Sequence, residues 1–436
     1  MKEELSIGRQ FKSVSGNTYK VLELLGEGGQ GFVYEVELYG QKYALKWYKR
    51  NTARKEQKQI IENLLQKPKP SEAFLWPLDM IEANGSFGYI MPLRPKRFKD
   101  IPALLSRRVE PSFRTLCMIG FNLVTAYRKL HASGYSYCDI NFGNVFFDPD
   151  TGEVLICDND NVTVDGMEQS QVMGTLGFMA PELVMANVNG TDERPATSTD
   201  LFSLAVLLFY LFMMHHPLHG AKEDAIRCFD YNAQVKLYGK EPVFIFDPND
   251  KSNKALRGVH DNAIIFWSLY PDYLKKLFVK AFTEGMTNPN RRVQEVEWQN
   301  AFTQMLNSII ICPDCGAENF YIEKKKEQMV SHICWGCDKT LSLPVSIVID
   351  NKRILLNSDT VISEHNLKGN YNILTQVASV VQNPKNPNIW GLRNESNDIW
   401  VYVKPDNTQI NVPSGKSATI AKGCKIKFGQ VEGYFE

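Results

Sequence analysis

Residues 137–147 read YCDINFGNVFF, a short segment in which an aspartate and an asparagine stand between apolar residues. Asp139 precedes Asn144 by five positions. At this spacing within one loop, a carboxylate can accept a proton while an amide oxygen binds a metal ion. The segment therefore predicts a catalytic loop, and the rest of the chain supplies the groups with which such a loop would work.

The length and composition of the chain limit what this loop can belong to. With 436 residues, the chain exceeds one ordinary core, so two or three domains are expected. Basic and acidic residues number 49 each, so the chain has no net positive charge that would attract nucleic acid or a membrane. The N-terminus lacks a signal-peptide core, and the apolar run 201–214 is shorter than the roughly 20 residues that span a bilayer. We therefore expect a cytoplasmic protein with reduced cysteines.

Hydrophobic patterning divides the chain into a strand-rich part, a helical part and a second strand-rich part. Apolar and polar residues alternate over residues 17–50 and 74–93, whereas residues 51–66 show the periodicity of an amphipathic helix. A β-rich first 95 residues followed by about 200 helical residues predicts two lobes. From residue 343 onward, short strands between turn signals predict a β-sandwich. The expected helices of the middle part cover residues 112–131, 200–214 and 271–309, the last with a turn at 288–290.

A glycine-rich turn lies in the first strand-rich part. Residues 25–34, LGEGGQGFVY, are followed by strand-like alternation with no sign of a helix. A hairpin whose backbone N–H groups approach phosphates therefore fits better than a dinucleotide-binding crossover, which would open a helix. The glycines of this turn are Gly26, Gly28, Gly29 and Gly31.

Lys46 stands beside Ala44 on the next expected strand, about fifteen residues past the glycines. A lysine so placed would bind phosphates and be held by a glutamate of the following helix. Glu56 and Glu62 both lie on that helix, and the sequence leaves both open. Glu62 is favoured because it lies closer to the apolar face of the helix.

In this order and at this spacing, the motifs over residues 17 to about 305 resemble a eukaryotic-type protein kinase domain of the bacterial Ser/Thr type. Beyond the glycine turn, Lys46 and the loop at Asp139, the resemblance rests on Asp158 after an apolar strand and on Ala180-Pro181-Glu182. It also rests on Asp200, which opens an apolar helix, and on Arg292, which would pair with Glu182. The resemblance implies a two-lobed fold and transfer of the γ-phosphate of ATP to serine or threonine.

The same resemblance implies a role for each site residue. Asp139 would be the catalytic base, and Lys46, Glu62 and Asn141 would complete the catalytic group. Asn144 and Asp158 would bind Mg²⁺ or Mn²⁺. Asp200 would cap backbone N–H groups at the start of its helix. The residues expected to bind ATP are Gly26, Gly28, Gly29, Gly31, Val33, Ala44, Lys46, Met91, Leu93 and Arg94.

Three positions depart from the kinase pattern. Cys138 stands where many regulated kinases have an arginine that pairs with a phosphorylated activation loop, which makes this chain non-RD and independent of such a switch. Asp158 is followed by Asn159 and Asp160 rather than phenylalanine and glycine, and Asp160 is interpreted as a solvated loop acid in preference to a metal ligand. Asn141 replaces a lysine whose charge-assisted contact to the phosphoryl group is worth roughly 1.5–3 kcal/mol, or about ten- to a hundredfold in rate.

Four cysteines after the kinase-like part form two pairs, Cys312 with Cys315 and Cys334 with Cys337, separated by eighteen residues. Two C-x2-C pairs at this spacing predict a four-cysteine structural Zn²⁺ site with no open position. Gly316 and Gly336 would permit tight turns at the pairs. The stretch resembles a zinc ribbon, and a redox function is the weaker interpretation because nothing resembles a thioredoxin unit.

The last 90 residues carry partial motifs of another family. Residues 390–398 and 424–429 resemble the second half of a forkhead-associated (FHA) domain. The first half lacks the expected Gly-Arg, and Ser363-Glu364-His365 matches the serine and histidine motif only in part. An FHA-like sandwich that contacts proteins without recognising phosphothreonine is therefore an equal interpretation.

We therefore expect a multidomain α+β protein: an N-terminal segment 1–16, a kinase domain 17–306, a zinc ribbon 307–342 and an FHA-like β-sandwich 343–436. Expected partners are protein substrates, a cognate metal-dependent protein phosphatase and other signalling proteins, with ribbon and sandwich binding partners or regulating the kinase. A pseudokinase scaffold is the alternative, which Asn141 and Asn159 favour. The intact catalytic residues oppose it: Lys46, Asp139, Asn144 and Asp158. A small-molecule phosphotransferase fits less well, because Ala180-Pro181-Glu182, Asp200 and Arg292 belong to kinases that act on proteins.

Overall fold

The computed structural model describes residues 4–83, 85–165, 173–322 and 332–436. They form two compact units. The first comprises Met1–Ser268 and Asp272–Trp298, and the second comprises Leu269–Pro271 and Gln299–Glu436. The first unit holds the residues that the sequence assigns to catalysis, and the second holds the cysteine pairs and the second strand-rich part.

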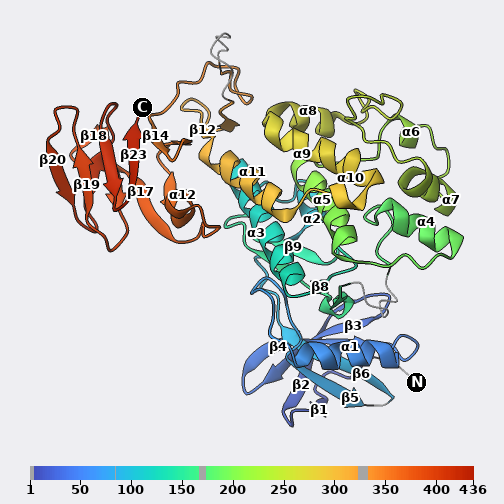
Figure 1. The fold of residues 1–436 in the computed structure, drawn as a ribbon. Helices are drawn as coiled ribbons and strands as arrows, with labels where there is room; N and C mark the ends of the chain where they lie inside the picture. The colour runs from blue at the N-terminus through green and yellow to red at the C-terminus, as the bar shows by residue number, and fades with distance from the viewer. Residues whose placement is uncertain (1–3, 84, 166–172, 323–331) are drawn as a thin grey trace. The chain divides into compact units, whose positions relative to one another are not determined.

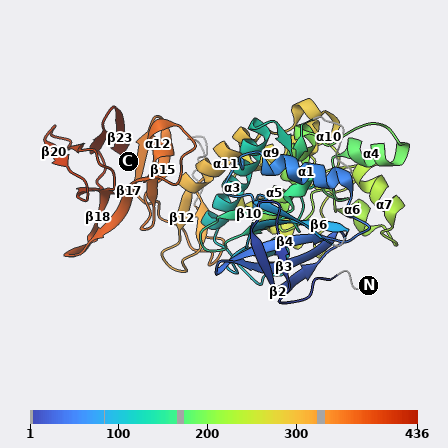
Figure 2. The ribbon, with the colours of Figure 1, turned by 90° about the horizontal axis from the view of Figure 1, so that it is seen from below.

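The first unit begins with a six-stranded antiparallel sheet (Figure 1). One face buries an apolar cluster that includes Val21, Val36 and Leu45. The other face packs against helix α1 (Lys55–Leu65), which Figure 2 shows beside β4 and β6. Ile61 of α1 and Met80 of the sheet belong to the same apolar cluster. The strands run in the order β1 (Gln10–Lys12), β2 (Thr18–Glu27), β3 (Gly31–Leu38), β4 (Gln41–Tyr48), β6 (Ser86–Pro92) and β5 (Asp79–Ala83).

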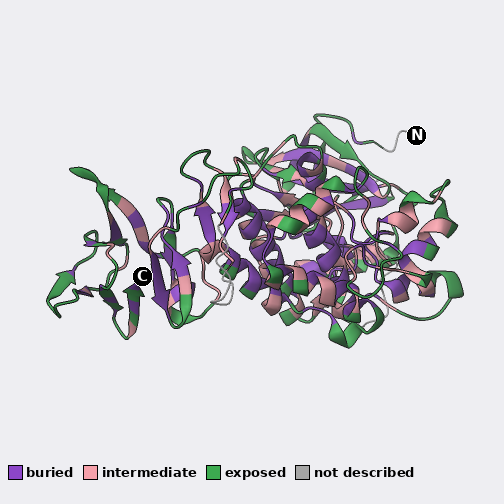
Figure 3. Ribbon diagram, turned by 90° about the horizontal axis from the view of Figure 1, so that it is seen from above, coloured by how far each residue is buried: buried purple, intermediate pink, exposed green. Residues whose placement is uncertain are grey.

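The helical part of the first unit is built around α3 (Phe113–Ala132) and α5 (Thr197–Met213). The apolar run at 201–214 lies in a buried core helix, as predicted. Figure 3 shows that buried residues of the first unit concentrate in its interior. α5 begins three residues before the expected start because Thr199 Oγ1 accepts from Ala196 N at 2.9 Å and caps the first turn. No helix in the described part of the chain has the length and apolarity needed to cross a membrane.

The remaining helices along the chain include the expected helical stretch near the end of the kinase-like part, interrupted at Asn288–Pro289 as predicted. In the first unit and up to the start of the second they are α2 (Ile101–Leu105), the 3-10 turn η1 (Asn159–Asn161), α4 (Pro181–Asn189), α6 (Ala221–Asp224), α7 (Tyr231–Val235), the π-helix η2 (Lys236–Lys240), α8 (Asp261–Leu269), α9 (Asp272–Phe282), α10 (Glu284–Thr287), the 3-10 turn η3 (Pro289–Arg291) and α11 (Glu295–Asn307).

Short strands lie on either side of the two loops that contain Asp139 and Asp158. β8 (Tyr135–Ser136) and β9 (Val145–Phe147) bracket the loop with Asp139, while β10 (Val154–Ile156) and β11 (Thr163–Val164) bracket the loop with Asp158. β10, β9 and β7 (Lys99–Asp100) form one sheet, and β11 pairs with β8. Because β9 pairs with β10 and β8 with β11, the two loops are held next to each other.

The second unit contains a hairpin and two larger sheets. β12 (Ile309–Ile311) pairs with β13 (Glu318–Phe320) beside the cysteines. One sheet has the order β15 (Lys352–Leu355), β14 (Ser346–Ile349), β23 (Val431–Phe435), β22 (Lys425–Phe428), β19 (Trp400–Val403) and β20 (Gln409–Val412). The other has the order β16 (Val361–Ser363), β17 (Gln376–Asn383), β18 (Asn386–Asn394) and β21 (Ser417–Thr419).

The two larger sheets enclose one core, to which Trp400 and Ile426 contribute from the first sheet and Val380 and Leu392 from the second. The prediction of strands from residue 343 onward is therefore confirmed. One helical turn, α12 (Glu364–Lys368), was not expected. It forms because Asn366 Oδ1 accepts from Ser363 N at 2.8 Å, which closes a capping box at the end of β16.

Candidate active site

The loop that follows β8 is anchored through its backbone by Asp200. Asp200 Oδ2 accepts from Tyr137 N at 2.6 Å, and Oδ1 accepts from Cys138 N at 3.0 Å. The expectation that Asp200 caps its own helix is wrong, because Thr199 caps α5 and leaves the Asp200 carboxylate for the neighbouring loop. Cys138 takes a left-handed φ of 69°, and the bonds to Asp200 hold the loop in this uncommon conformation.

Asp139 and Asn144 come together at the centre of this loop. Asn144 Nδ2 donates to the Asp139 carbonyl oxygen at 2.9 Å and lies 3.4 Å from Asp139 Oδ2. Because its nitrogen is used in this way, the amide oxygen of Asn144 is the atom left to bind a cation. Asp139 Oδ1 accepts a hydrogen bond from the Thr175 hydroxyl at 2.7 Å. A hydroxyl therefore already occupies the position of a proton donor to this carboxylate.

Asn141 bonds within the same group. Its Nδ2 donates to Thr175 Oγ1 at 3.1 Å and to the Asp139 carbonyl oxygen at 3.2 Å. Its Oδ1 accepts from Gly143 N at 2.7 Å. Asn141 thus orients the loop and the Thr175 hydroxyl with neutral hydrogen bonds, without the positive charge of a lysine.

Asp158 lies on the adjacent loop, two residues after the end of β10. Cys157 N donates to the Asn144 carbonyl oxygen at 2.9 Å, which fixes the two loops together. Asp158 has a left-handed φ of 52°, and 35% of its side-chain surface is exposed. Burial raises the pKa of Asp158, although nearby Lys46 opposes the shift. Asp158 thus presents an accessible carboxylate beside Asn144, the oxygen donor set that Mg²⁺ prefers.

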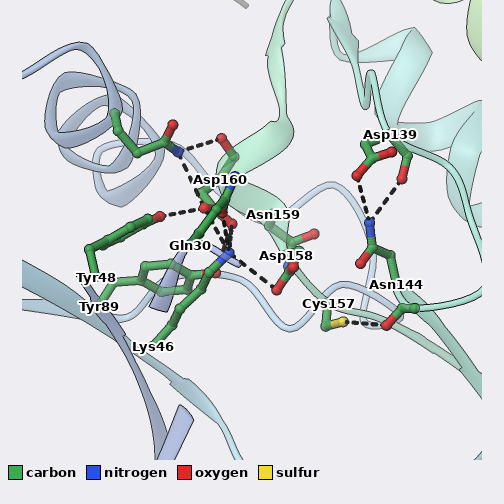
Figure 4. Close-up of polar contacts among 12 residues, drawn as sticks. Gln30, Lys46, Tyr48, Tyr89, Asp139, Asn144, Cys157, Asp158, Asn159 and Asp160 are labelled. Atoms are coloured by element: carbon green, nitrogen blue, oxygen red, sulfur yellow. Dashed lines mark hydrogen bonds and ion pairs between the residues drawn. The ribbon is translucent and has the colours of Figure 1, made fainter. Parts of the chain in front are cut away.

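Lys46 approaches these loops from β4, and Figure 4 shows its ammonium group between two carboxylates. Its Nζ lies 3.0 and 2.9 Å from the two oxygens of Asp160, 3.4 Å from Asp158 Oδ1 and 3.1 Å from Gln30 Oε1. Burial lowers the pKa of Lys46, but the carboxylates of Asp160 and Asp158 outweigh that effect and raise it above its usual value. Lys46 is therefore a buried, charged group.

Two expectations about the partner of Lys46 need correction. Asp160 is not a solvated loop acid: its side chain is fully buried and holds the ammonium group of Lys46. Glu62, expected to hold Lys46, lies 3.7 Å from Lys58 instead and is 40% exposed. The phase of α1, set by Ile61 and Leu64 against the sheet, directs Glu62 away from Lys46.

The apolar residues expected to bind ATP lie together. Ala44 pairs with Met91 across β4 and β6, and Val33 pairs with Lys46 across β3 and β4. Leu93 completes the group, and Leu155 and Cys157, which sequence reasoning missed, pack into the same cluster. Arg94 follows β6, and its side chain donates to the Phe98 carbonyl oxygen at 2.7 Å.

The glycine turn lies between β2 and β3. Gly28 N donates to the Gly31 carbonyl oxygen at 2.8 Å, which closes the turn above Lys46. A Cβ at Gly31 would lie 2.2 Å from the Trp47 carbonyl oxygen, so glycine is required there by the neighbouring strand. Around Gly26 and Gly29 a Cβ would meet no atom within 4 Å, which leaves space over the turn.

Four buried or partly buried groups that sequence reasoning missed complete the Lys46 environment. Tyr48 and Tyr89 donate through their hydroxyls to Asp160, the second at 3.0 Å. Gln30 and Gln57 supply the amide contacts. Tyr48 lies two residues after Lys46 on β4, and this alternation was the one available signal that both side chains share a face.

The four cysteines of the second unit form one cluster. Their sulfurs all lie within 4.8 Å of one another, with Cys312 to Cys337 at 3.7 Å and Cys315 to Cys334 at 3.6 Å. Zn–S bonds of about 2.3 Å in a tetrahedron would place sulfurs about 3.8 Å apart, so the spacing fits zinc. The residues between the pairs include 323–331, which lie outside the described residues.

The turns at the cysteine pairs differ from the expectation in one detail. Gly316 has the left-handed φ of 76° that a tight turn needs, but at the second pair Asp338 takes this conformation with a φ of 57°. Gly336 instead lies in a closely packed place, where a Cβ would be 3.1 Å from the Ala317 side chain and 3.5 Å from Cys315 Sγ. The two pairs therefore close similar turns with different residues.

Comparison with known proteins shows a family match over the first unit and several similar kinases. Residues 19–308 match the family described as protein kinase domain. The serine/threonine-protein kinase MPS1 of Encephalitozoon cuniculi is 24% identical over 214 residues, which cover 47% of this chain and 35% of that protein. The DNA damage-responsive serine/threonine-protein kinase RqkA of Deinococcus radiodurans is 28% identical over 227 residues, 48% of this chain and 31% of that protein. The protein kinase YegI of Escherichia coli is 22% identical over 322 residues, 68% of this chain and 48% of that protein. The chain thus spans a third to a half of the length of these relatives.

Proposed function

The chain belongs to the protein kinase family, and from this premise we propose that it transfers the γ-phosphate of Mg-ATP to serine or threonine hydroxyls of protein substrates, its own chain included. The observation that carries the proposal is the bond from the Thr175 hydroxyl to Asp139 Oδ1 at 2.7 Å, next to Asn144 and Asp158. A carboxylate that accepts an alcohol at this distance is placed to orient and deprotonate a substrate hydroxyl.

Each residue of the site has a part in this reaction. Asp139 takes the proton of the attacking hydroxyl, and Asn141 holds the loop around it. Asn144 and Asp158 supply the oxygen ligands for Mg²⁺ or Mn²⁺, which neutralises charge on the phosphates when bound. Lys46 contacts the phosphates from β4, and the glycine turn covers them with backbone N–H groups. The apolar cluster of Val33, Ala44, Met91 and Leu93 receives the adenine.

The activity is tested by transfer of radiolabelled phosphate from ATP to the protein itself and to a generic basic protein. We expect transfer by the wild type and its loss by at least a hundredfold in Asp139→Asn, which keeps the shape of the side chain and removes the base. Phosphoamino-acid analysis should show phosphoserine or phosphothreonine. Binding of Mg-ATP by the wild type without any transfer would overturn the enzyme proposal and leave a nucleotide-binding scaffold.

Cys138 supports activity that does not depend on activation-loop phosphorylation. The Cys138 side chain is buried, and its sulfur lies 3.6 Å from Ser136 Oγ and 3.4 Å from Thr163 Oγ1. A cysteine at this position offers no positive charge to a phosphate on the activation loop. Protein treated with a phosphatase before the assay should therefore keep its initial rate.

We further propose that the cysteine cluster binds one structural zinc ion. All four sulfurs are used, so no ligand position remains for a substrate. Metal analysis of the purified protein should find one zinc per chain, and a strong chelator should increase hydrogen exchange around Cys312 and Cys334. Purified protein that contains no metal, with the peptides around Cys312 and Cys334 still protected from exchange, would refute the proposal.

The FHA-like sheets of the second unit are proposed to bind protein partners through contacts other than phosphothreonine. Ser363, the residue that would meet the phosphate, is 6% exposed, and its hydroxyl bonds Asn366 Oδ1 at 3.0 Å. His365 is likewise buried and bonds the Asn370 carbonyl oxygen. Titration with phosphothreonine peptides should show no binding, whereas saturable binding would overturn this part of the proposal.

A further inference from the structure

Asp160 is enclosed by hydrogen-bond donors from four different side chains. Lys46 Nζ reaches both carboxylate oxygens, Tyr89 donates to Oδ1 at 3.0 Å, and Tyr48 donates to Oδ2. Gln57 Nε2 lies 3.3 Å from Oδ2 and donates to the Asp160 carbonyl oxygen at 2.8 Å. A buried carboxylate with this many donors is a strongly fixed anion.

These contacts also exclude a role for Asp160 as a metal ligand. Both oxygens are occupied by donors, and the side chain has no exposure to the space beside Asp158. A carboxylate that binds Mg²⁺ needs an open lone pair and room for water. Asp160 therefore acts on Lys46, and Asp158 is left as the carboxylate that faces the metal site.

The side chain that α1 sends toward Lys46 and Asp160 is neutral. Gln57 on α1 contacts Asp160, and its Nε2 donates hydrogen bonds to the Asp160 carbonyl oxygen and to Oδ2. Glu62, one turn further, contacts Lys58. In the described structure the negative charge beside Lys46 thus comes from the loop after β10 and not from the helix.

We propose that Asp160 is the positioning residue that aims Lys46 at the phosphates, in the place of a helix glutamate, with Gln57 as the neutral helix residue that orients Asp160. This inference rests on the proposed function, since it assigns a part in phosphate transfer. Asp160 lies two residues after Asp158, so one loop sets both the lysine and the metal-binding carboxylate. Displacement of α1 would therefore not withdraw the charge that holds Lys46.

The experiment compares single variants with an exchange of the charge. Asp160→Asn removes the carboxylate charge with little change in shape, and Glu62→Gln removes the helix charge that the structure places elsewhere. Asp160→Gly removes the loop carboxylate altogether, and Asp160→Gly combined with Gln57→Glu moves it from the loop to the helix. Each protein is measured for binding of a fluorescent ATP analogue with Mg²⁺, for kcat and KM of transfer, and for its unfolding temperature.

We expect Asp160→Asn to lower kcat/KM and analogue affinity by about tenfold or more, and Glu62→Gln to have an effect at least ten times smaller. The double variant should recover at least half of the loss on a logarithmic scale relative to Asp160→Gly alone. A purely structural Asp160 would give no such recovery. Tyr89→Phe, which removes one donor and keeps the ring, should give a smaller loss of the same kind and serves if Asp160→Asn fails to fold.

Two results would overturn the inference: a loss in Glu62→Gln as large as that in Asp160→Asn, or a double variant no better than Asp160→Gly. The binding measurement separates the two proposals. If the wild type binds the analogue but transfers no phosphate, the proposed activity fails, while the analogue affinities of the variants still decide whether Asp160 positions Lys46.

Discussion

His131 is expected to stabilise the first unit as a charged residue. Its Nε2 lies 3.1 Å from Asp200 Oδ2, its Nδ1 lies 2.5 Å from Glu295 Oε1, and its side chain is 6% exposed. Burial lowers the pKa of His131, but the hydrogen bonds that it donates to the carboxylates of Asp200 and Glu295 outweigh this effect and raise the pKa from 6.5 to about 9. Arg128 lies near enough to contribute to the charge balance at Glu295. The change in pKa corresponds to about 3 kcal/mol of stability.

The sign of the pH dependence follows from the direction of this shift. Because the folded state holds the proton more tightly than the unfolded state, the contribution is fully present below about pH 6.5. It is lost as the pH rises through about 9, where the folded protein also releases the proton. His131→Gln removes the charge, so the difference in unfolding free energy between wild type and variant should shrink by about 3 kcal/mol from pH 6 to pH 10.

The assay is urea unfolding at pH 6, 8 and 10, followed by hydrogen exchange of peptides from α3 and α5, which report on the first unit. His215→Gln is the matched control, because burial lowers the pKa of His215 and its contribution changes in the opposite direction, below about pH 6.5. The control difference should be flat from pH 8 to pH 10. A His131→Gln difference that is equally flat would show that His131 is neutral in the folded protein and refute the reasoning.

Three further expectations concern other residues. Asn141→Lys should raise kcat of phosphate transfer by about ten- to a hundredfold, because it adds a charge-assisted contact to the phosphoryl group; an unchanged or lower kcat would show that the bonds of Asn141 to Thr175 and Gly143 matter more. Glu182→Gln should lower the unfolding free energy by about 3 kcal/mol, because it leaves the guanidinium of Arg292, 1% exposed and 2.7 Å from Glu182 Oε1, without a carboxylate. The exposed variant Glu72→Gln is the control. If Glu182→Gln lowers the unfolding temperature less than Glu72→Gln does, the expected loss of stability is contradicted. Cys334→Ser should abolish stoichiometric zinc in metal analysis, while the kinase-domain peptides keep their hydrogen-exchange protection.

The spacing of residues that are close in the sequence was sufficient to predict much of the site. Asp139 and Asn144 lie five residues apart in one loop, so the chain between them leaves few ways to separate their side chains. The cysteine pairs are predictable for the same reason, since C-x2-C brings two sulfurs together within a single turn. The pairing of Glu182 with Arg292 was also confirmed, although it joins distant parts of the chain, because family motifs supplied both residues.

The partner of Lys46 was not predictable in this way. Asn159, Asp160 and Asn161 form a polar run of the kind that usually lies in solvent, yet all three residues are buried. Asp160 is buried because Lys46, 114 positions earlier, reaches it together with Tyr48 and Tyr89. The sequence of the loop itself does not indicate these hydrogen-bond donors, because they lie on strands β4 and β6 of the other lobe.

The difference between local spacing and long-range packing also explains why Gln57 and not Glu62 lies beside the Lys46–Asp160 pair, and why the role of Asp200 was corrected. Sequence patterns indicated that a helix follows Lys46 and that an aspartate opens α5. Which side chain of α1 faces the lysine depends on how Ile61 and Leu64 seat the helix on the sheet, and the loop that Asp200 holds depends on where β8 ends. Motif chemistry is encoded over a few neighbouring residues, whereas the orientation of a charge is set by packing between elements far apart in the chain.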